Sequence, residues 1–342
     1  MKVWNGFRSG VNLGGWLSQC IHTEEHYRDF IHEDDIKTIS SWGVDHVRVP
    51  VDYDLVEDKD GNPRESGYAH LDDAISWCGK YGLNMILDLH KTAGFSFDKG
   101  EKEDGFFTSE AYQERFYRLW ESFAARYAKY ENMLAFELLN EVTAKEYCDT
   151  WNRISLECIR RIRRIAPSIR ILVGGYYNNS AEAVKDLAMP ADENIVYNFH
   201  CYLPIVFTHQ GAYWVDGMDT SFRISIRETY GKMSAETKKM IRDLPNELDA
   251  FSPEETLDSI YFEKIFDEAI RTAEERNVPL YCGEYGVIDR ADPKEILEWY
   301  KLIHPVFEKH NIGRAAWSYK KMDFGLSDSR MDGVRDELVK YL

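Results

Sequence analysis

Short apolar runs alternate with amphipathic stretches along most of this chain of 342 residues. Stretches 109–130 and 293–310, for example, repeat apolar side chains at helical spacing. Eight strands that are each followed by a helix, in a chain of this length, predict an α/β fold of the (β/α)8 TIM-barrel type. The eight runs expected to form the strands are SGVNLG near residue 11, VDHVRVP (44–50), LNMILDLH (83–90), MLAFELLNE (133–141), IRILVGG (169–175), NIVYNFHCY (194–202), VPLYCGEYG (278–286) and GRAAWSYK (313–320).

One segment departs from this alternation. Residues 203–260, after the sixth run, are rich in Asp, Glu, Ser and Met, with a helical centre near SAETKKMIRDL. The segment is too long for an ordinary βα loop and too short for a separate domain. We therefore expect a single barrel domain over residues 1–342, with an insertion subdomain at about 203–260. This insertion is expected to cap one side of the face on which barrel enzymes hold their active sites.

Composition and charge narrow the class of partner. Hydrophobic residues make up 44% of the chain, which is enough for a large core, and the net charge is -17. Such a charge repels nucleic acid and anionic membranes, so neither is expected as a partner. The basic stretch 159–170 belongs to an outer helix, because its arginines lie off an apolar stripe. That stripe consists of Trp151, Ile154, Cys158, Ile162 and Ile165.

Neither the cysteines nor the apolar segments indicate a disulfide framework, a zinc site or a membrane span. The six cysteines include no C-x-x-C pair and are interpreted as small buried hydrophobic residues. The chain has no apolar signal core at its start and no apolar run long enough to cross a membrane. We expect a soluble monomer, either cytoplasmic or secreted with its signal removed. No nucleotide-binding motif is present, so no cofactor is expected.

Polar side chains gather where the predicted strands end. In a TIM barrel the carboxyl ends of the strands meet at one face, which holds the active site. A single Glu or His at such a place is more often a surface or core residue, but this many convergent cases favour a functional site. The residues are Arg48, Asp88, His90, Asn140, Glu141, His200, Tyr202, Glu284 and Trp317.

Two of these residues, Glu141 after the fourth strand and Glu284 at the end of the seventh, form a pair of carboxyl groups. Hydrolysis of a glycosidic bond requires two such groups, one to donate a proton to the leaving oxygen and one to attack the anomeric carbon. A separation of about 5–5.5 Å gives retention of configuration through a covalent glycosyl-enzyme. Mutual repulsion keeps one of the two groups protonated while the other is ionised.

The neighbouring residues then acquire expected roles. Asn140 can bind the 2-hydroxyl of the sugar, a contact that strengthens in the transition state. Arg48 can hold Glu284 ionised through a charge-assisted hydrogen bond, and Tyr202 can bind the other oxygen of the same carboxylate. His200 can orient or tune the acid. Trp317 offers a flat platform for the sugar.

With these residues in place, the chain resembles glycoside hydrolase family 5, and most closely its compact endoglucanases of the cellulase C type. That type also carries an insertion after the sixth strand. The resemblance implies Glu141 as acid/base and Glu284 as nucleophile, with Arg48, His90, Asn140, His200, Tyr202 and Trp317 completing the site. It extends from Gly10 to about Leu326 through GVNLGGWLSQ, DHVRVPVDY, LDLHKTAGF, AFELLNEV, VYNFHCYLPIVFTHQ, LYCGEYGVI and AAWSYKKMDFGL.

Two positions depart from the pattern of that family. Val142 stands where many members have proline, and Lys91 stands where relatives often have a second histidine, which adds a positive charge near the substrate. The resemblance implies a soluble β-1,4-glucan as substrate, such as mixed-linkage β-glucan or carboxymethyl cellulose. Candidate substrate contacts outside the catalytic centre are Lys91, Phe95, Phe97, His209 and Trp214, although burial in the core is the ordinary alternative for the aromatic ones.

Three alternatives remain at this stage. A β-mannanase would use the same catalytic residues and differ in how it treats the axial 2-hydroxyl near Asn140 and His90. A non-catalytic sugar-binding barrel would keep the aromatic platforms and need neither glutamate. A metal-dependent hydrolase could use His22 and His26, yet they follow the first strand in a predicted loop and lack the H-E-x-x-H order, so no metal is expected.

Overall fold

Eight parallel strands close into a barrel in the computed structural model, which describes residues 1–98, 100–240 and 246–342. Each strand pairs with its neighbours in sequence, and the first pairs with the last. The predicted TIM barrel is therefore confirmed. The strands are β1 (Ser9–Asn12), β2 (His46–Asp52), β3 (Asn84–Lys91), β4 (Leu134–Glu137), β5 (Arg170–Val173), β6 (Ile195–Cys201), β7 (Leu280–Tyr285) and β8 (Gly313–Ala316).

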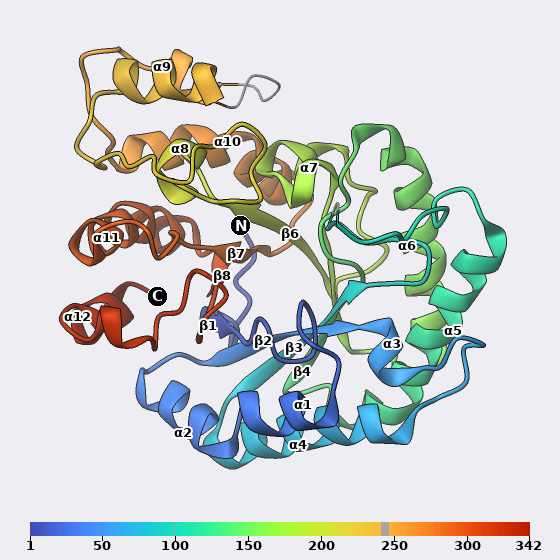
Figure 1. Ribbon diagram of the computed structural model, residues 1–342. Coiled ribbons are helices and arrows are strands. Elements are labelled where there is room, and N and C mark those ends of the chain that lie inside the picture. Colours follow the sequence, from blue (N-terminus) through green and yellow to red (C-terminus); the bar gives the residue numbers. More distant parts are fainter. Residues whose placement is uncertain (99, 241–245) are drawn as a thin grey trace.

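Helices surround the strands, and α9 lies on the far side of α8 and α10 from the barrel (Figure 1). The α-helices are α1 (Glu24–Phe30), α2 (Glu33–Ser41), α3 (Tyr53–Val56), α4 (Glu65–Tyr81), α5 (Glu110–Tyr127), α6 (Cys148–Arg163), α7 (Tyr176–Asn179), α8 (Ile205–Thr208), α9 (Tyr230–Met240), α10 (Ser259–Glu275), α11 (Pro293–His310) and α12 (Arg335–Leu338). Short 3-10 helices are η1 (Ala128–Tyr130), η2 (Lys145–Tyr147), η3 (Ala181–Asp186), η4 (Glu247–Ala250), η5 (Ser329–Met331) and η6 (Val339–Tyr341).

The longest outer helices begin and end where their capping residues predict. The side chain of Ser109 accepts a hydrogen bond from the backbone at the start of α5, and Asp292 does the same for α11. Proline occupies the first turn of α11, and Asn311 ends the helix in the left-handed conformation. The predicted helix at 293–310 thus has the observed bounds, whereas the one at 109–130 becomes 3-10 after Tyr127.

The amino-terminal end of the barrel is filled by a separate apolar cluster. The rings of Trp4 and Phe7, which precede β1, stack with their centroids 4.1 Å apart, and Trp4 also contacts the ring of Tyr281 from β7. These residues are buried. The segment before the first strand therefore closes the base of the barrel. The cluster consists of Trp4, Phe7, Ile86, Ala135, Leu172, Val196, Tyr281 and Ala315.

Several predicted boundaries were wrong. β4 ends at Glu137 rather than residue 141, because the chain leaves the strand and Glu141 adopts a left-handed conformation with φ of 46°. β8 likewise ends at Ala316 rather than residue 320. The predicted apolar stripe of α6 is buried from Trp151 to Ile162, but Ile165 lies beyond the helix and is 39% exposed.

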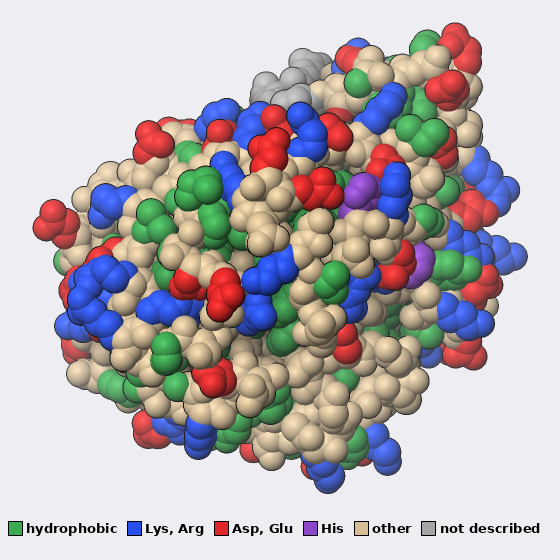
Figure 2. All heavy atoms as spheres, turned by 180° about the vertical axis from the view of Figure 1, so that it is seen from behind, with side chains coloured by type: hydrophobic (Ala, Val, Ile, Leu, Met, Phe, Trp, Pro, Cys, Tyr) green, Lys and Arg blue, Asp and Glu red, His purple; other side chains and the backbone are tan. Residues whose placement is uncertain are grey.

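Carboxylates bind the arginines in the second half of α6, whereas Arg153 donates a hydrogen bond to the amide oxygen of Gln113. Arg160 binds Glu157, and Arg161 binds both Glu157 and Glu114 at 2.7–2.8 Å. Acidic and basic side chains are also interspersed over the face shown in Figure 2. This stretch is therefore an outer helix, as predicted. Four of the six cysteines are buried, and Cys20 and Cys148 are half-buried.

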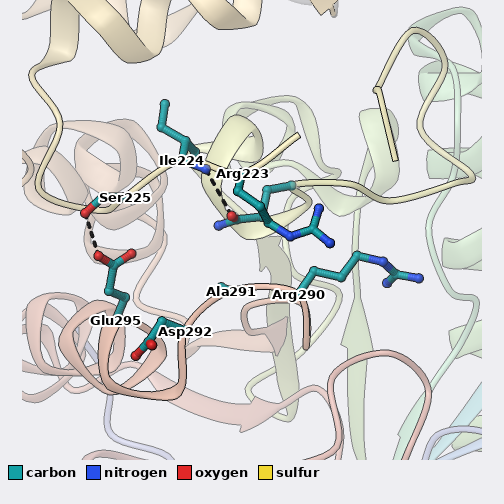
Figure 3. Close-up of a pocket in the computed structure, with 8 residues that line it drawn as sticks. Arg223, Ile224, Ser225, Arg290, Ala291, Asp292 and Glu295 are labelled. Carbon is teal, nitrogen blue, oxygen red and sulfur yellow. Dashed lines mark hydrogen bonds between the residues drawn. The ribbon is translucent and has the colours of Figure 1, made fainter. Parts of the chain in front are cut away.

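The segment between β6 and α10 is attached to the barrel by hydrogen bonds. Ser225 Oγ and the Ile226 N–H donate to the carboxylate of Glu295 on α11, at 2.5 and 3.2 Å, and the Ile224 N–H donates to Gln210. Figure 3 shows Ile224, Ser225 and Glu295 around a hollow of about 470 Å³, together with Arg223 and Arg290. The helical centre predicted near SAETKKMIRDL is α9 up to Met240, and the rest of that prediction lies outside the described residues.

Candidate active site

Most of the polar residues expected at the strand ends do converge at the carboxyl-terminal end of the barrel. Arg48, His90, His200 and Glu284 lie on β2, β3, β6 and β7, in the last part of each strand or near its middle. Asn140, Glu141, Tyr202 and Trp317 follow β4, β6 and β8 directly or after a few residues. Hydrogen bonds and ring contacts connect these side chains, as described below. Nearly all of them are buried: Arg48, Asp88, His90, Asn140, Glu141, His200, Glu284 and Trp317.

The carboxylate of Glu284 is held on both oxygens. Oε1 accepts a hydrogen bond from Arg48 Nη1 at 2.7 Å, and Oε2 accepts one from the Tyr202 hydroxyl at 2.9 Å. Burial opposes ionisation, but the positive charges of His200, Arg48 and His90 and the Tyr202 hydrogen bond outweigh it and lower the pKa of Glu284 to about 2. Glu284 is therefore ionised at neutral pH.

Glu141 has a different environment. Its Oε1 lies 2.8 Å from His200 Nδ1, and its Oε2 accepts a hydrogen bond from Asn178 at 3.0 Å. Burial lowers the pKa of His200, but the charge of Glu284 and the contact with Glu141 raise it above its ordinary value overall. The left-handed backbone of Glu141 is uncommon for a residue with a side chain and costs about 1–2 kcal/mol. The surrounding structure thus holds this carboxyl in a conformation that an isolated chain would avoid.

The two carboxyl groups face one another across a short gap. One oxygen of Glu141, one oxygen of Glu284 and a nitrogen of His200 all lie within 4.8 Å of one another. His200 Nδ1 is 3.7 Å from Glu284 Oε2 and contacts Glu141 more closely. An ionised carboxylate held by Arg48 and a second carboxyl in contact with a histidine can perform nucleophilic and acid–base chemistry, respectively.

Arg48 is the centre of this network. Its side chain is fully buried, and its guanidinium uses its N–H groups on side chains from several different strands and loops. Three of its partners are carboxylates, so the positive charge is more than balanced. The partners are Asn12 at 2.9 Å, Asp88 at 3.0 Å, Glu137 at 2.7 and 2.9 Å, Asn140 at 2.9 Å and Glu284 at 2.7 Å.

His90 and Trp317 form a second part of the site. Their rings are parallel, with centroids 5.8 Å apart, and the ring of Phe97 meets His90 edge-on at 4.9 Å. His90 Nδ1 contacts Asp88 at 2.6 Å. Burial lowers the pKa of His90, yet the charge and hydrogen bond of Asp88 raise it overall, so the imidazolium is favoured.

A chain of aromatic rings extends from Glu284 toward the segment after β6. The ring of Tyr202 meets His209 at 5.1 Å, and His209 meets Trp214 at 6.0 Å, while Phe324 contacts all three. Burial lowers the pKa of His209 to about 4, so this imidazole is neutral at neutral pH. Trp214 is 41% exposed and can accept a ligand on its surface.

The two remaining candidate contacts lie in other environments. Lys91 Nζ binds Glu101 at 3.0 Å and lies 3.8 Å from Asp52, so its charge is matched by carboxylates. Burial lowers its pKa, but Asp52, Asp54 and Glu101 raise it overall. The ring of Phe95 is buried against Phe106 and Phe107, so the structure gives it a core position and does not bring it into the network around Glu284.

The two histidines of the HTEEH stretch have separate partners. His26 lies on α1 rather than in the predicted loop, and its Nε2 contacts the carbonyl of Gly15 at 2.7 Å. His22 Nε2 contacts Asp52 at 3.2 Å, and the hydrogen bond that it donates to the Asp52 carboxylate raises the pKa of His22 to about 10. Among the residues that the structure describes, two groups of side chains have metal-compatible spacing, namely His22 with Asp52 and Asp54, and Glu141 with His200 and Glu284. In the second group, the carboxylates already accept hydrogen bonds from Arg48, Tyr202 and Asn178.

Reasoning from sequence missed the residues beneath the catalytic layer. Glu137, Asn12 and Asn198 are fully buried and bind one another or Arg48. A signal for two of them was present, because Glu137 and Asn198 are polar residues inside apolar runs. Asn178, which binds Glu141, carried no such signal, because it follows β5 in a run of polar and aromatic residues.

Comparisons with known proteins agree with one another across the chain. A family model described as "Cellulase (glycosyl hydrolase family 5)" matches residues 8–323. Cellodextrinase A of Ruminococcus flavefaciens is 48% identical over 90% of this chain and 84% of its own length. Endoglucanase C of Acetivibrio thermocellus is 36% identical over 98% of both chains. The crystal structure of the clostridial cellulose synthase subunit Z from Clostridioides difficile has a TM-score of 0.76 and 26% identity, covering 98% of this chain and 99% of that one.

Proposed function

Because this chain belongs to glycosyl hydrolase family 5, we propose that it is a retaining endo-β-1,4-glucanase with Glu284 as nucleophile and Glu141 as acid/base. The observation that carries the proposal is the pair of carboxyl groups whose oxygens approach within 4.8 Å. That spacing leaves no room for a water molecule to attack from the opposite face of the sugar, as inversion would require. The lowered pKa of Glu284 assigns it the ionised role.

In the first step, a Glu284 oxygen attacks the anomeric carbon while Glu141 donates a proton to the leaving glycosidic oxygen. A bond forms between the carboxylate and the sugar, and the bond to the leaving group breaks. The proton comes from the hydrogen-bonded pair of Glu141 and His200, whose facing atoms are 2.8 Å apart. Arg48 and Tyr202 hold the carboxylate in line for attack.

In the second step, Glu141, now ionised, removes a proton from a water molecule that attacks the same carbon and releases Glu284. The proton taken from water replaces the one that departed with the leaving group, which restores the pair of Glu141 and His200. Two inversions at one carbon give net retention. Asn140 is held by Arg48 at 2.9 Å through its Oδ1, and its Nδ2 lies 3.5 Å from His90 Nε2, which leaves an amide N–H for the 2-hydroxyl of the sugar.

Aromatic surfaces around the catalytic pair are the proposed substrate contacts. Trp317 provides the platform for the sugar that is attacked, with His90 parallel to it on one side. Trp214 and His209 extend the contact surface along the segment after β6, which we propose borders the cleft. Lys91 follows His90 directly and is proposed to contact the substrate from β3. The core position of Phe95 removes it from this set.

The proposed substrate is a soluble β-1,4-linked glucan, either a polymer or an oligosaccharide. One relative is named a cellodextrinase and another an endoglucanase, and both names refer to β-1,4-glucan chains of different lengths. The shared chemistry of the site does not depend on chain length, because it involves the sugar at the cleaved bond. Among the described residues, no helix has both the length and the hydropathy of a membrane span.

Release of reducing ends from barley mixed-linkage β-glucan, carboxymethyl cellulose, cello-oligosaccharides and pure mannan tests this function. Wild type and Glu284→Ala are compared with a chelator in both, and the first product anomer is read by NMR. We expect β-glucan turnover by wild type alone, with the β-anomer formed first. Turnover by Glu284→Ala, or an α-anomer, would contradict the mechanism, and faster cleavage of mannan would reassign the substrate.

A further inference from the structure

Next to Glu284, strand β7 contains one more residue than the neighbouring strands β6 and β8. On the β6 side, Cys282 pairs with Phe199 and Glu284 pairs with His200, so Gly283 is skipped. The pairing with β8 shifts in the same place. An extra residue of this kind, a β-bulge, turns the strand locally and re-aims the next side chain. Here the next side chain is the proposed nucleophile.

Two buried asparagines hold both backbone groups of Gly283. The Gly283 N–H donates to Asn198 Oδ1 at 2.9 Å, and the Asn12 amide donates to the Gly283 carbonyl at 3.0 Å. Both asparagines are fully buried. A buried backbone group without a hydrogen-bond partner opposes folding, so these side chains stabilise the bulge rather than regular pairing.

The same asparagines connect the bulge to the guanidinium that holds the nucleophile. Asn198 Nδ2 donates to Glu137 Oε1 at 2.8 Å, and Glu137 accepts two hydrogen bonds from Arg48. Asn12 Oδ1 accepts directly from Arg48 Nη1, the atom that also binds Glu284. The backbone before Glu284 and the carboxylate of Glu284 are thus fixed to one rigid group from two sides.

A residue with a side chain does not fit at the position of Gly283. A Cβ atom there would lie 2.8 Å from Asn198 Oδ1, 2.9 Å from Asn198 Nδ2 and 3.0 Å from His200 Nε2. Only glycine lets Asn198 reach the backbone and His200 remain beside it. The bulge, the asparagine and the histidine therefore form one packed unit.

We propose that Asn198 is a positioning residue that sets the aim of the Glu284 carboxylate by linking the Gly283 bulge to Glu137 and Arg48. This inference rests on the proposed function, in which Glu284 is the nucleophile. Asn198 itself lies below the sugar-binding residues and acts through the backbone. Misplacing a reacting group by about 1 Å costs about 100-fold in rate, which sets the expected size of the effect.

The first experiment compares Asn198→Ala with wild type on β-glucan and on an activated aryl β-glycoside. We expect kcat to fall about 100-fold on both substrates with KM within about threefold, because the carboxylate and not the sugar is displaced. The matched control is Asn152→Ala, which removes an asparagine that bridges Asp186 and Ala188 on the outside of the barrel. The control should keep wild-type kcat. A kcat for Asn198→Ala within threefold of wild type would overturn the inference.

The second experiment tests whether Asn198→Ala still lowers the reaction rate after the nucleophile has been removed. In Glu284→Ala, azide can attack the anomeric carbon of the aryl glycoside, forming a C–N bond as the aryl oxide leaves. Adding Asn198→Ala to this background should change the azide-dependent rate by less than about threefold, because no carboxylate remains to be aimed. An equal, roughly 100-fold loss in both backgrounds would show that Asn198 supports the barrel in general. Full activity of Glu284→Ala without azide would instead refute the proposed function.

A third variant, Asn198→Asp, preserves the side-chain volume if the alanine variant folds poorly. In this variant, one carboxylate oxygen of residue 198 can still accept a hydrogen bond from the Gly283 N–H. The other oxygen would face Glu137 Oε1, which in wild type accepts a hydrogen bond from Asn198 Nδ2 at 2.8 Å. Protonation of that carboxyl restores the donor, so the ratio of variant to wild-type kcat should rise as the pH falls. A ratio that does not change with pH would overturn the proposed link to Glu137.

Discussion

The same strands line both ends of the barrel interior, but they contribute apolar side chains at one end and polar or charged side chains at the other. β3 contributes Ile86 at the base, then Asp88 and His90, and β6 contributes Val196, then Asn198 and His200. Inward-facing residues alternate along a strand, so each change occurs over two residues, or about 6.6 Å. The change from an apolar core to a charged site therefore occurs between one layer of inward-facing side chains and the next.

The difference shows where stability and activity are located. The base buries apolar rings and aliphatic side chains, whose removal from water favours folding. The opposite end buries Asp88, Glu137, Glu141 and Glu284 around an arginine, and the desolvation of these groups opposes folding unless every charge is paired. We infer that the base stabilises a barrel on which the charged end can be maintained. The following substitutions test this division, beginning with the largest expected effect on activity.

Glu284→Ala should lower kcat on β-glucan by about 10⁵-fold, because the attacking group is lost. The matched control at the other end is Glu308→Ala, which removes the carboxylate that binds Arg314 at 2.6 Å. Steady-state kinetics should show wild-type kcat for the control. A large loss of activity in Glu308→Ala would contradict the division between the two ends.

Glu141→Gln should lower kcat on β-glucan by about 10³-fold while largely sparing the first step on an aryl glycoside whose leaving group needs no proton. Burst kinetics with a dinitrophenyl glycoside measure that step separately from hydrolysis. Equal slowing of both substrates in the first step would show that Glu141 is not the acid.

Arg48→Lys should lower kcat by about 100-fold, because a lysine ammonium cannot bind Glu137 and Glu284 in the same plane. Arg314→Lys is the comparison, since Arg314 is also a buried strand arginine and lies at the base. The second variant should lose stability in denaturant titrations and keep its kcat. Similar kinetic losses in both variants would make the role of Arg48 purely structural.

The lowered pKa of Glu284 predicts a pH-dependent contribution to stability. Its ionised form is favoured in the folded state, with a pKa of about 2 against an ordinary 4.5. The contribution is therefore complete above about pH 4.5 and is lost as the pH falls toward 2. The difference in unfolding free energy between wild type and Glu284→Gln should shrink over this range. A difference that stays constant from pH 7 to pH 3 would contradict the lowered pKa.

Trp4→Ala should have the smallest effect on activity and a large effect on stability. Loss of a buried ring that stacks on Phe7 should lower the free energy of unfolding by about 3–5 kcal/mol. The control is Trp214→Ala, whose ring is 41% exposed, so that its unfolding free energy should change little. Thermal unfolding and kcat per folded molecule separate the two outcomes. A lower kcat in folded Trp4→Ala would link the base to the chemistry.

The sequence was sufficient to predict the barrel and the gathering of the polar strand ends. Parallel buried strands appear as apolar runs, and the carboxyl ends of such strands must meet, so residues such as Arg48 and Glu284 could be placed together without coordinates. The roles of Glu141 and Glu284 remain predictions supported by their geometry. The family membership followed from the same motifs and is confirmed by the family model.

Other features could not be read from local pattern. Glu137 and Asn198 were overlooked because a polar residue within an apolar run shows its meaning only when the facing strand is known. The ends of β4 and β8 were placed too late, because apolar loop residues such as Leu138 and Leu139 are buried like strand residues. Phe95, which is buried against Phe106 and Phe107, shows that an aromatic residue near a site can also pack in the core.

The closure of the barrel base also imposes an order on synthesis. Trp4 and Phe7 are translated long before their partners Tyr281 and Ala315. At 5–20 residues per second, the interval is roughly 15–60 s. The pairing of Ser9 with Arg314 must wait equally long. Two large aromatic side chains thus wait for these contacts during that interval, so we expect this segment of the nascent chain to depend on chaperones.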